Sequence, residues 1–144
     1  MNKICTDIKQ SQKLIESGID VNTADMVYYW FGNFELNDEW YELHLGTNRV
    51  NDKDIPAWSL SALMNLLPSE FTEVGKYSTT KYEINIRKYK LTDEVNLHQI
   101  AYGSYKWHED GGYTWSDMIN TGEKEELLDA VFEMVVWLKE NNRL

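Results

Sequence analysis

The sequence has a single cysteine, Cys5, and only two prolines in 144 residues. One cysteine excludes an intramolecular disulfide, so nothing here indicates an oxidising compartment. No stretch approaches the ~20 apolar residues of a membrane helix. The N-terminal segment carries Lys3, Asp7 and Lys9 and lacks the apolar core of a signal peptide. We therefore expect a soluble protein of the cytoplasm, with no membrane partner.

Positive charge is also scarce. The chain has 14 basic and 24 acidic residues, a formal net charge of −10. Because affinity for nucleic acid comes largely from lysine and arginine, this balance argues against general nucleic-acid binding. Residues 76–90 are the exception, with five basic residues against Glu83: Lys76, Lys81, Arg87, Lys88 and Lys90. An anionic partner would be attracted there, although a solvated charged surface explains the same pattern.

The N-terminal part changes from a helical to a strand pattern. Residues 7–17 have the spacing of a short amphipathic helix, with Thr6 or the first of these residues as N-cap and Gly18 as its end. Residues 26–34 and 39–45 are rich in aromatic and β-branched residues and are separated by turn-forming residues. This arrangement predicts an antiparallel hairpin.

Both prolines lie within residues 55–71 and frame a second short helix. Pro56 lacks the amide hydrogen that a central strand needs, so we expect the chain to reach Trp58 without strand pairing. Ser59 is the expected N-cap and Pro68 the expected end. Apolar residues recur between them at helical spacing: Leu60, Leu63, Met64 and Leu67.

Three further strands are expected in residues 81–90, 95–107 and 113–119. The first alternates apolar and polar residues with a period of two. The second is expected to bend at Gly103, and the glycines of residues 109–112 favour a tight turn before the third. Short connections between consecutive strands predict an antiparallel meander.

A closing helix is expected over residues 122–142, with Thr121 as N-cap and acidic residues in its first turn. Its apolar stripe comprises Leu127, Leu128, Val131, Met134, Val135 and Leu138. The predicted fold class is therefore α+β. We expect a single domain over residues 1–144 in the order α-ββ-α-βββ-α, with an antiparallel sheet of about five strands packed by two or three helices.

Three segments of the sequence are similar to segments of known sequences. They are the helix between the two prolines, IPAWSLSALMNLLP, the meander rich in Trp and Tyr, and the closing helix, LLDAVFEMVVWLKEN. Together they resemble a group of small uncharacterised proteins carried by phages and mobile elements of gut bacteria. The resemblance covers roughly residues 55–141 and rests mostly on packing residues. It implies a shared fold and a phage-like setting, in which accessory proteins of this size are frequently non-enzymatic binders, including inhibitors of host defence.

Aromatic residues are the first candidate binding surface. They form two clusters, one comprising Tyr28, Tyr29, Trp30, Phe31, Phe34, Trp40 and Tyr41, the other Tyr102, Tyr105, Trp107, Tyr113 and Trp115. Across a hairpin, Tyr105, Trp107, Tyr113 and Trp115 are expected to lie near one another. Exposed rings offer platforms for a nucleobase or a protein partner. Cross-strand packing is the alternative explanation.

The basic strand is the second candidate. Lys81, Arg87 and Tyr89 are expected on one face, where they could hold a phosphate or carboxylate beside an aromatic ring. Protection of a sheet edge by lysines explains the same residues. The leading hypothesis is a non-enzymatic protein that binds an anionic, nucleotide-like small ligand. The predicted ligand-binding residues are Lys81, Arg87, Tyr89, Tyr105, Trp107 and Trp115.

An acidic inhibitor of a host protein is the second hypothesis. The closing helix would then use Glu125, Glu126 and Asp129 to contact a basic surface on its partner. A homodimer is also plausible, because a large exposed aromatic surface on a small protein usually contacts another molecule.

A small hydrolase is the third hypothesis, using His98 or His108 with a carboxylate. No histidine, cysteine or carboxylate has the spacing that a metal cage or catalytic group requires. We therefore expect no catalytic residue, no metal and no cofactor.

Overall fold

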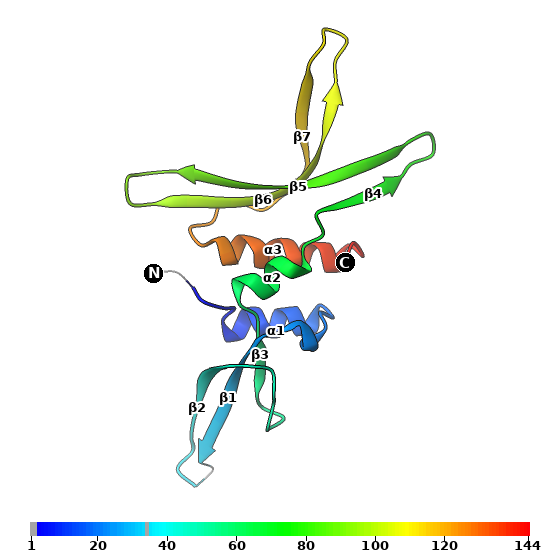
Figure 1. Cartoon of the computed structure of the whole chain (residues 1–144). Helices are drawn as coiled ribbons and strands as arrows, with labels where there is room; N and C mark the ends of the chain where they lie inside the picture. Colours follow the sequence, from blue (N-terminus) through cyan, green and yellow to red (C-terminus); the bar gives the residue numbers. More distant parts are fainter. Residues whose placement is uncertain (1–2, 34) are drawn as a thin grey trace. The chain divides into compact units, whose positions relative to one another are not determined.

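The structure is a computed structural model that describes residues 3–33 and 35–144. The predicted α+β class is confirmed: the described residues form three α-helices and two antiparallel sheets, of three and four strands (Figure 1). Contacts divide the chain into two compact units, Met1–Leu66 and Leu67–Leu144, and each is described by itself. Two short strands, β3 and β4, were not predicted.

Helix α1, Ile8–Glu16, opens the first unit as predicted. The Asp7 carboxylate accepts a hydrogen bond from the Gln10 amide (2.8 Å), and the Gln10 side chain accepts one from the Asp7 amide (3.1 Å). This reciprocal pair forms a capping box. Gly18 ends the helix with a φ of +91°, a conformation that glycine adopts without a steric penalty.

The predicted hairpin is confirmed as β1, Met26–Asn33, and β2, Asp38–Leu45. The third strand, β3, Ile55–Ala57, pairs antiparallel with β1 and gives the order β2-β1-β3. The expectation that Pro56 prevents strand pairing is therefore wrong. The backbone N–H and C=O of Trp58 are hydrogen-bonded to Thr6, on the side of the strand away from β1. Backbone groups two residues apart point to the same side, so the nitrogen of Pro56 also points away from β1. A proline is tolerated in an edge strand for this reason.

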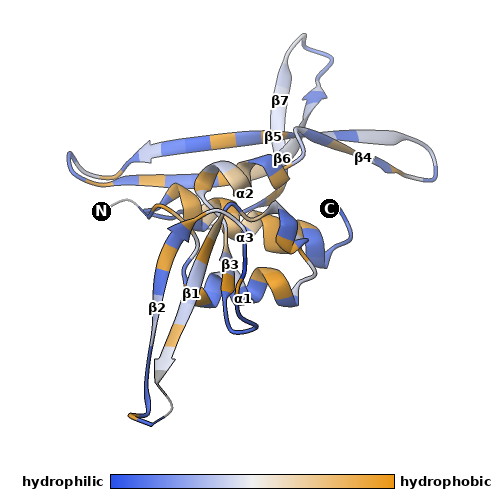
Figure 2. Cartoon of the chain, turned by 60° about the horizontal axis from the view of Figure 1, so that its bottom comes forward, coloured by the Kyte–Doolittle hydropathy of each residue, from blue (hydrophilic) through white to orange (hydrophobic). Residues whose placement is uncertain are grey.

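Helix α2, Leu60–Leu66, follows as predicted. The Ser59 hydroxyl accepts a hydrogen bond from the Ala62 amide (3.1 Å), which confirms Ser59 as the cap. Trp58 and Leu63 are fully buried, and the Trp58 indole donates to the Thr23 hydroxyl (2.9 Å) in the 3-10 turn η1, Val21–Thr23. Figure 2 shows hydrophobic segments on the helices and on several strands, while β2 is largely hydrophilic.

The second unit contains a four-stranded sheet of order β4-β5-β6-β7. Its strands are β4, Glu70–Val74; β5, Thr79–Lys90; β6, Asn96–Trp107; and β7, Tyr113–Asn120. The predicted irregularity at Gly103 is present. The register shifts there, because Tyr102 pairs with Ile119 but Gly103 with Asp117. This bulge lies where β6 turns away from β5, so the end of β6 and β7 project as a two-stranded arm (Figure 1).

Helix α3, Leu127–Glu140, closes the unit. It begins later than predicted, and Thr121 is not its cap. The backbone of residues 121–124 is instead bonded to β6: the Thr121 amide donates to the Ile100 carbonyl (2.9 Å), and Lys124 exchanges two hydrogen bonds with His98. Asp129 is therefore the acidic residue of the first turn. Five residues of the predicted apolar stripe are buried: Leu128, Val131, Met134, Val135 and Leu138.

The two faces of the four-stranded sheet differ. Helix α3 packs against β6, and Arg143, just beyond α3, lies over the ring of Phe71, which contacts Tyr102. On that face Ile100 and Tyr102 are fully buried, whereas Lys88 and His98 lie nearer the turn between β5 and β6. Side chains at alternate positions point to the opposite face, which we call the outer face. Among the residues that it carries from β5, β6 and β7 are Lys81, Glu83, Arg87, Tyr89, Gln99, Gly103, Tyr105, Trp107, Tyr113, Trp115 and Asp117.

Candidate functional site

The outer face carries all six residues that the sequence predicts to bind a ligand. The alternation along each strand and the register between strands place them there: Lys81, Arg87 and Tyr89 on β5, Tyr105 and Trp107 on β6, and Trp115 on β7. They divide into three groups with different surroundings, described in turn below.

Two pairs of aromatic rings line the arm. Tyr105 lies opposite Trp115 with ring centroids 5.1 Å apart, and Trp107 lies opposite Tyr113 at 4.9 Å, both edge to face. The predicted proximity of these four rings is therefore confirmed. Tyr105, Trp107 and Tyr113 are 62, 56 and 67% exposed. The rings thus pack against one another and still present a broad surface to solvent.

Arg87 is bound by a carboxylate of the same chain. Its Nη1 donates to one Asp117 oxygen (2.8 Å), and its Nη2 donates to the other. Nη1 also donates to Gln99 Oε1 (3.1 Å). The Arg87 and Asp117 side chains are only 21 and 22% exposed. A bidentate pair of this kind, largely shielded from water, ties β5 to β7 across β6.

Further hydrogen bonds converge on the same carboxylate. The Trp115 indole donates to Asp117 (2.5 Å), and the Asn120 amide donates to it as well (3.2 Å). These contacts, and above all the hydrogen bond from Arg87, lower the pKa of Asp117 to about 2. Asp117 raises the pKa of Arg87 in turn. Both groups are therefore charged at any physiological pH.

This pairing bears on the predicted role of Arg87. A ligand phosphate could bind the guanidinium only by displacing Asp117, which already fills its bidentate site. The position of Arg87 therefore favours a structural role, as the anchor of the arm. Asp117 and Gln99 were missed by sequence reasoning. Their common signal was alternation, because Asp117 lies two residues after Trp115 and so shares its face.

Trp115 packs onto the backbone of the neighbouring strand. A Cβ atom at Gly103 would lie 2.8 Å from the Trp115 ring and 2.3 Å from the Ser116 carbonyl oxygen. Only a glycine leaves room for this contact. Trp115 is half-buried as a result, and it supports the arm rather than presenting a free platform.

Lys81 and Tyr105 line a hollow of about 350 Å³, together with Thr79, Thr80, Glu83 and Ser104. Lys81 Nζ lies 2.8 Å from Glu70 and 3.5 Å from Glu83, and the hydrogen bond to Glu70 raises the pKa of Lys81. All three side chains are about half exposed, so water competes for these ion pairs. The hollow therefore combines a cation, a carboxylate, hydroxyls and an aromatic ring.

Tyr89, the remaining predicted residue, lies apart from the hollow. Its hydroxyl donates to Gln99 Oε1 (3.4 Å), the same oxygen that accepts from Arg87. Gln99 in turn donates to the Thr121 carbonyl (2.9 Å). Tyr89 therefore belongs to the network around Arg87.

The first aromatic cluster lies on both faces of β1 and β2, and Phe34 falls outside the described residues. Tyr28 packs against the core, and its hydroxyl donates to the Thr6 carbonyl (2.8 Å). On the opposite face Phe31 stacks on Trp40, with centroids 5.7 Å apart and both rings exposed. The Trp30 indole donates to Glu39 (3.0 Å), and the Lys53 ammonium lies 4.2 Å from the Trp30 ring centroid. The cluster is thus divided between core and surface.

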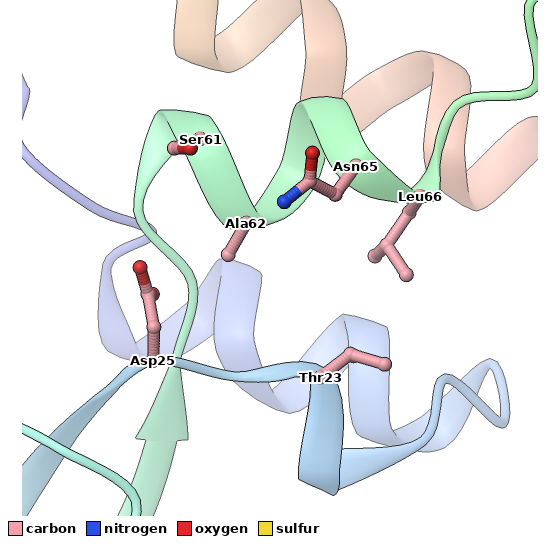
Figure 3. Close-up of a pocket in the computed structure, with 6 residues that line it drawn as sticks. All are labelled: Thr23, Asp25, Ser61, Ala62, Asn65 and Leu66. Carbon is pink, nitrogen blue, oxygen red and sulfur yellow. The ribbon is translucent and has the colours of Figure 1, made fainter.

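A second hollow, of about 320 Å³, lies beside α2 and is lined by Thr23, Asp25, Ser61, Ala62, Asn65 and Leu66. Figure 3 shows Ala62 and Leu66 pointing to the side on which Thr23 and Asp25 lie. Both Asp25 oxygens accept hydrogen bonds from Ser59, one from its amide (2.8 Å) and one from its hydroxyl (2.5 Å). Asp25 therefore fixes the start of α2, and this hollow brings together none of the predicted residues.

The predicted acidic surface lies at the start of α3. Glu125 precedes the helix and is exposed, Glu126 occupies the N-cap position, and Asp129 lies in the first turn; the last two are half-buried. The interaction of these residues with a host protein stays a prediction.

The histidines make contacts of other kinds. His108 Nε2 is hydrogen-bonded to the Thr114 hydroxyl, and His98 pairs through its backbone with Lys124. His44 lies 3.4 Å from Glu42 on the exposed hairpin of the first unit. Within residues 3–33 and 35–144, no three His, Cys, Asp or Glu side chains are grouped so that they could hold a metal ion. The same residues include no helix long and apolar enough to cross a membrane.

Comparison with known proteins finds no matching family model, no matching curated protein and no matching solved structure.

Proposed function

We propose that the protein is a non-enzymatic binding protein that holds a small, nucleotide-like ligand at the hollow beside Tyr105. One observation carries the proposal: a space of about 350 Å³ is lined by two predicted ligand-binding residues, Lys81 and Tyr105. That volume lies at the lower end of the range typical of small-molecule sites.

The chemistry of the lining suits a planar base joined to an anionic group. The exposed Tyr105 ring offers a face for stacking, and the other aromatic residues of the arm extend this surface. Lys81 would hold the anionic group, because its exposed ion pairs with Glu70 and Glu83 can be exchanged for a phosphate. The Glu83 carboxylate would accept hydrogen bonds from the base or sugar, and the hydroxyl groups of Thr79 and Ser104 could donate or accept them.

The cellular setting is part of the same proposal. The sequence resemblance supports an accessory protein of a phage or mobile element, acting in the cytoplasm of its bacterial host. The activity proposed is binding without turnover, in a protein that could act as an inhibitor of host defence.

The proposal is tested by titrating the protein with AMP, GMP, CMP and UMP and measuring the change in tryptophan fluorescence. We expect at least one nucleotide to bind, and Lys81→Gln and Tyr105→Ala each to weaken binding by about tenfold or more, because each removes one of the two main contacts. Lys88→Gln is the matched control, since Lys88 lies on the same strand but on the opposite face. Absence of binding by all four nucleotides, or wild-type affinity in Lys81→Gln, would show the proposal to be wrong.

A further inference from the structure

The two sheets have four edge strands, and three of them carry features that hinder pairing with another chain. Strand β3 has three residues and contains Pro56. Strand β4 has five residues, two of them glutamates, and β2 carries three carboxylates. Shortness, proline and charge are the usual means by which proteins protect a sheet edge.

Strand β7 has none of these features. Its eight residues include no lysine, arginine or proline, and its one carboxylate, Asp117, is paired with Arg87 on the outer face. The sheet order ends at β7, and the arm stands away from β4 and β5 in Figures 1 and 2. Over Tyr113–Asp117, ahead of the bulge at Met118, this edge therefore carries no proline and no unpaired charge.

The turn at the tip of the arm fixes which backbone groups of β7 point outward. The His108 amide donates to the Gly112 carbonyl (2.8 Å), so these two residues form a hydrogen-bonded pair. In an antiparallel ladder such pairs alternate with pairs whose amides face away from each other. Because hydrogen-bonded and non-hydrogen-bonded pairs alternate along the register, three residues of β7 direct their N–H and C=O groups away from β6: Tyr113, Trp115 and Asp117.

We propose that β7 pairs antiparallel with β7 of a second copy of this chain, about a two-fold axis at Trp115. In this register Tyr113 lies opposite Asp117 of the partner subunit, and Trp115 opposite the partner's Trp115. All three outward-facing residues of each strand then meet outward-facing residues of the other, so their backbone groups are satisfied mutually. Thr114 lies opposite Ser116 of the partner subunit, a hydroxyl pair that is favourable in antiparallel sheets.

Charge favours a second copy at this edge over other surfaces of the protein. The chain carries a net charge of −10, so most of its surfaces repel another copy. Strand β7 adds no unpaired charge, because Arg87 neutralises Asp117. Pairing here brings two acidic proteins together through neutral strands, and it does not depend on ligand binding.

The mass of the full-length protein, measured by analytical ultracentrifugation from micromolar to millimolar concentration, tests the proposal. We expect a monomer–dimer equilibrium. Tyr113→Pro removes an outward amide and leaves the ladder with β6 intact, and it should weaken dimerisation by about tenfold or more, because each dimer loses two hydrogen bonds. Tyr113→Ala retains the amide and should have a clearly smaller effect. A monomer at every concentration, or equal effects of the two substitutions, would overturn the proposal.

Amide hydrogen exchange on the unaltered protein provides a second measurement. The amides of Tyr113, Trp115 and Asp117 should exchange more slowly as the concentration rises. The amides of Thr114 and Ser116 bond to β6 and should be protected at all concentrations. A dimer in which the three outward amides exchange freely would contradict pairing through β7.

Discussion

Each unit of the chain has a hairpin in which a tryptophan ring covers a glycine and donates its indole N–H to a carboxylate. In the first unit Trp30 covers Gly32 and donates to Glu39. In the second Trp115 covers Gly103 and donates to Asp117. The two arrangements use similar residues, and they differ in the further contacts that the carboxylate makes.

The difference lies in the range of the contacts. Glu39 is exposed and lies on the strand paired with that of Trp30, so its bond stabilises one hairpin. Asp117 is mostly shielded and binds Arg87 two strands away, on β5. The same local motif is therefore a surface contact in one unit and the anchor of a whole sheet in the other. Three predictions test this contrast, from the largest expected effect to the smallest.

Substitution of the two carboxylates should give the largest difference in stability between the two hairpins. Asp117→Asn leaves Arg87 without its anionic partner and should lower the free energy of unfolding by about 2–3 kcal/mol, because a shielded charge loses charge-assisted hydrogen bonds. Glu39→Gln should change it by less than about 0.5 kcal/mol, as exposed substitutions usually do. Urea unfolding of both variants measures the difference. Equal effects would show that the Arg87–Asp117 pair does not anchor the sheet.

Substitution of the two glycines should give a smaller difference of the same sign. Gly103→Ala forces Cβ against the Ser116 carbonyl, which cannot move without disturbing the β6–β7 ladder, and should destabilise by about 1–3 kcal/mol. The three atoms nearest to a Cβ at Gly32 all belong to the Trp30 side chain, the closest at 2.0 Å, and that ring can turn aside. Thermal unfolding checks the order. A larger loss in Gly32→Ala would contradict it.

Acid should remove the contribution of Asp117 gradually, by about 1 kcal/mol per pH unit, which is the smallest step of the three. Because Arg87 lowers the pKa of folded Asp117 to about 2, from 3.8, protonation favours the unfolded chain. The stability that Asp117 contributes is therefore complete above about pH 4 and is lost as the pH falls toward 2. Urea midpoints between pH 5 and 2 should fall less steeply in Asp117→Asn than in the wild type. Parallel curves would mean that Asp117 is not perturbed.

The secondary structure was largely predictable because it follows from local patterns. Periodicity and caps located α1, α2 and the long strands. Strand β3 was missed because the effect of Pro56 depends on which side of the strand its nitrogen faces, and only pairing decides that. The start of α3 was missed because residues 121–124 bond to β6, a contact between distant parts of the sequence.

The candidate site was predictable in part for the same reason. Alternation placed Lys81, Arg87 and Tyr89 on one face of their strand, as found. It could not show that Asp117 lies opposite Gly103 and within reach of Arg87, because that depends on the register and on the bulge beside Tyr102. A cation that looks available for a ligand in the sequence can thus be occupied in the fold.

Native mass spectrometry of the protein, purified gently from a bacterial lysate at low salt, tests the central claim most directly. The claim is that the hollow of Lys81 and Tyr105 holds a small ligand. We predict a bound mass of nucleotide size in the wild type and in Lys88→Gln, and its loss in Lys81→Gln. A bound mass that persists in Lys81→Gln, or a wild-type protein free of any adduct, would contradict the account.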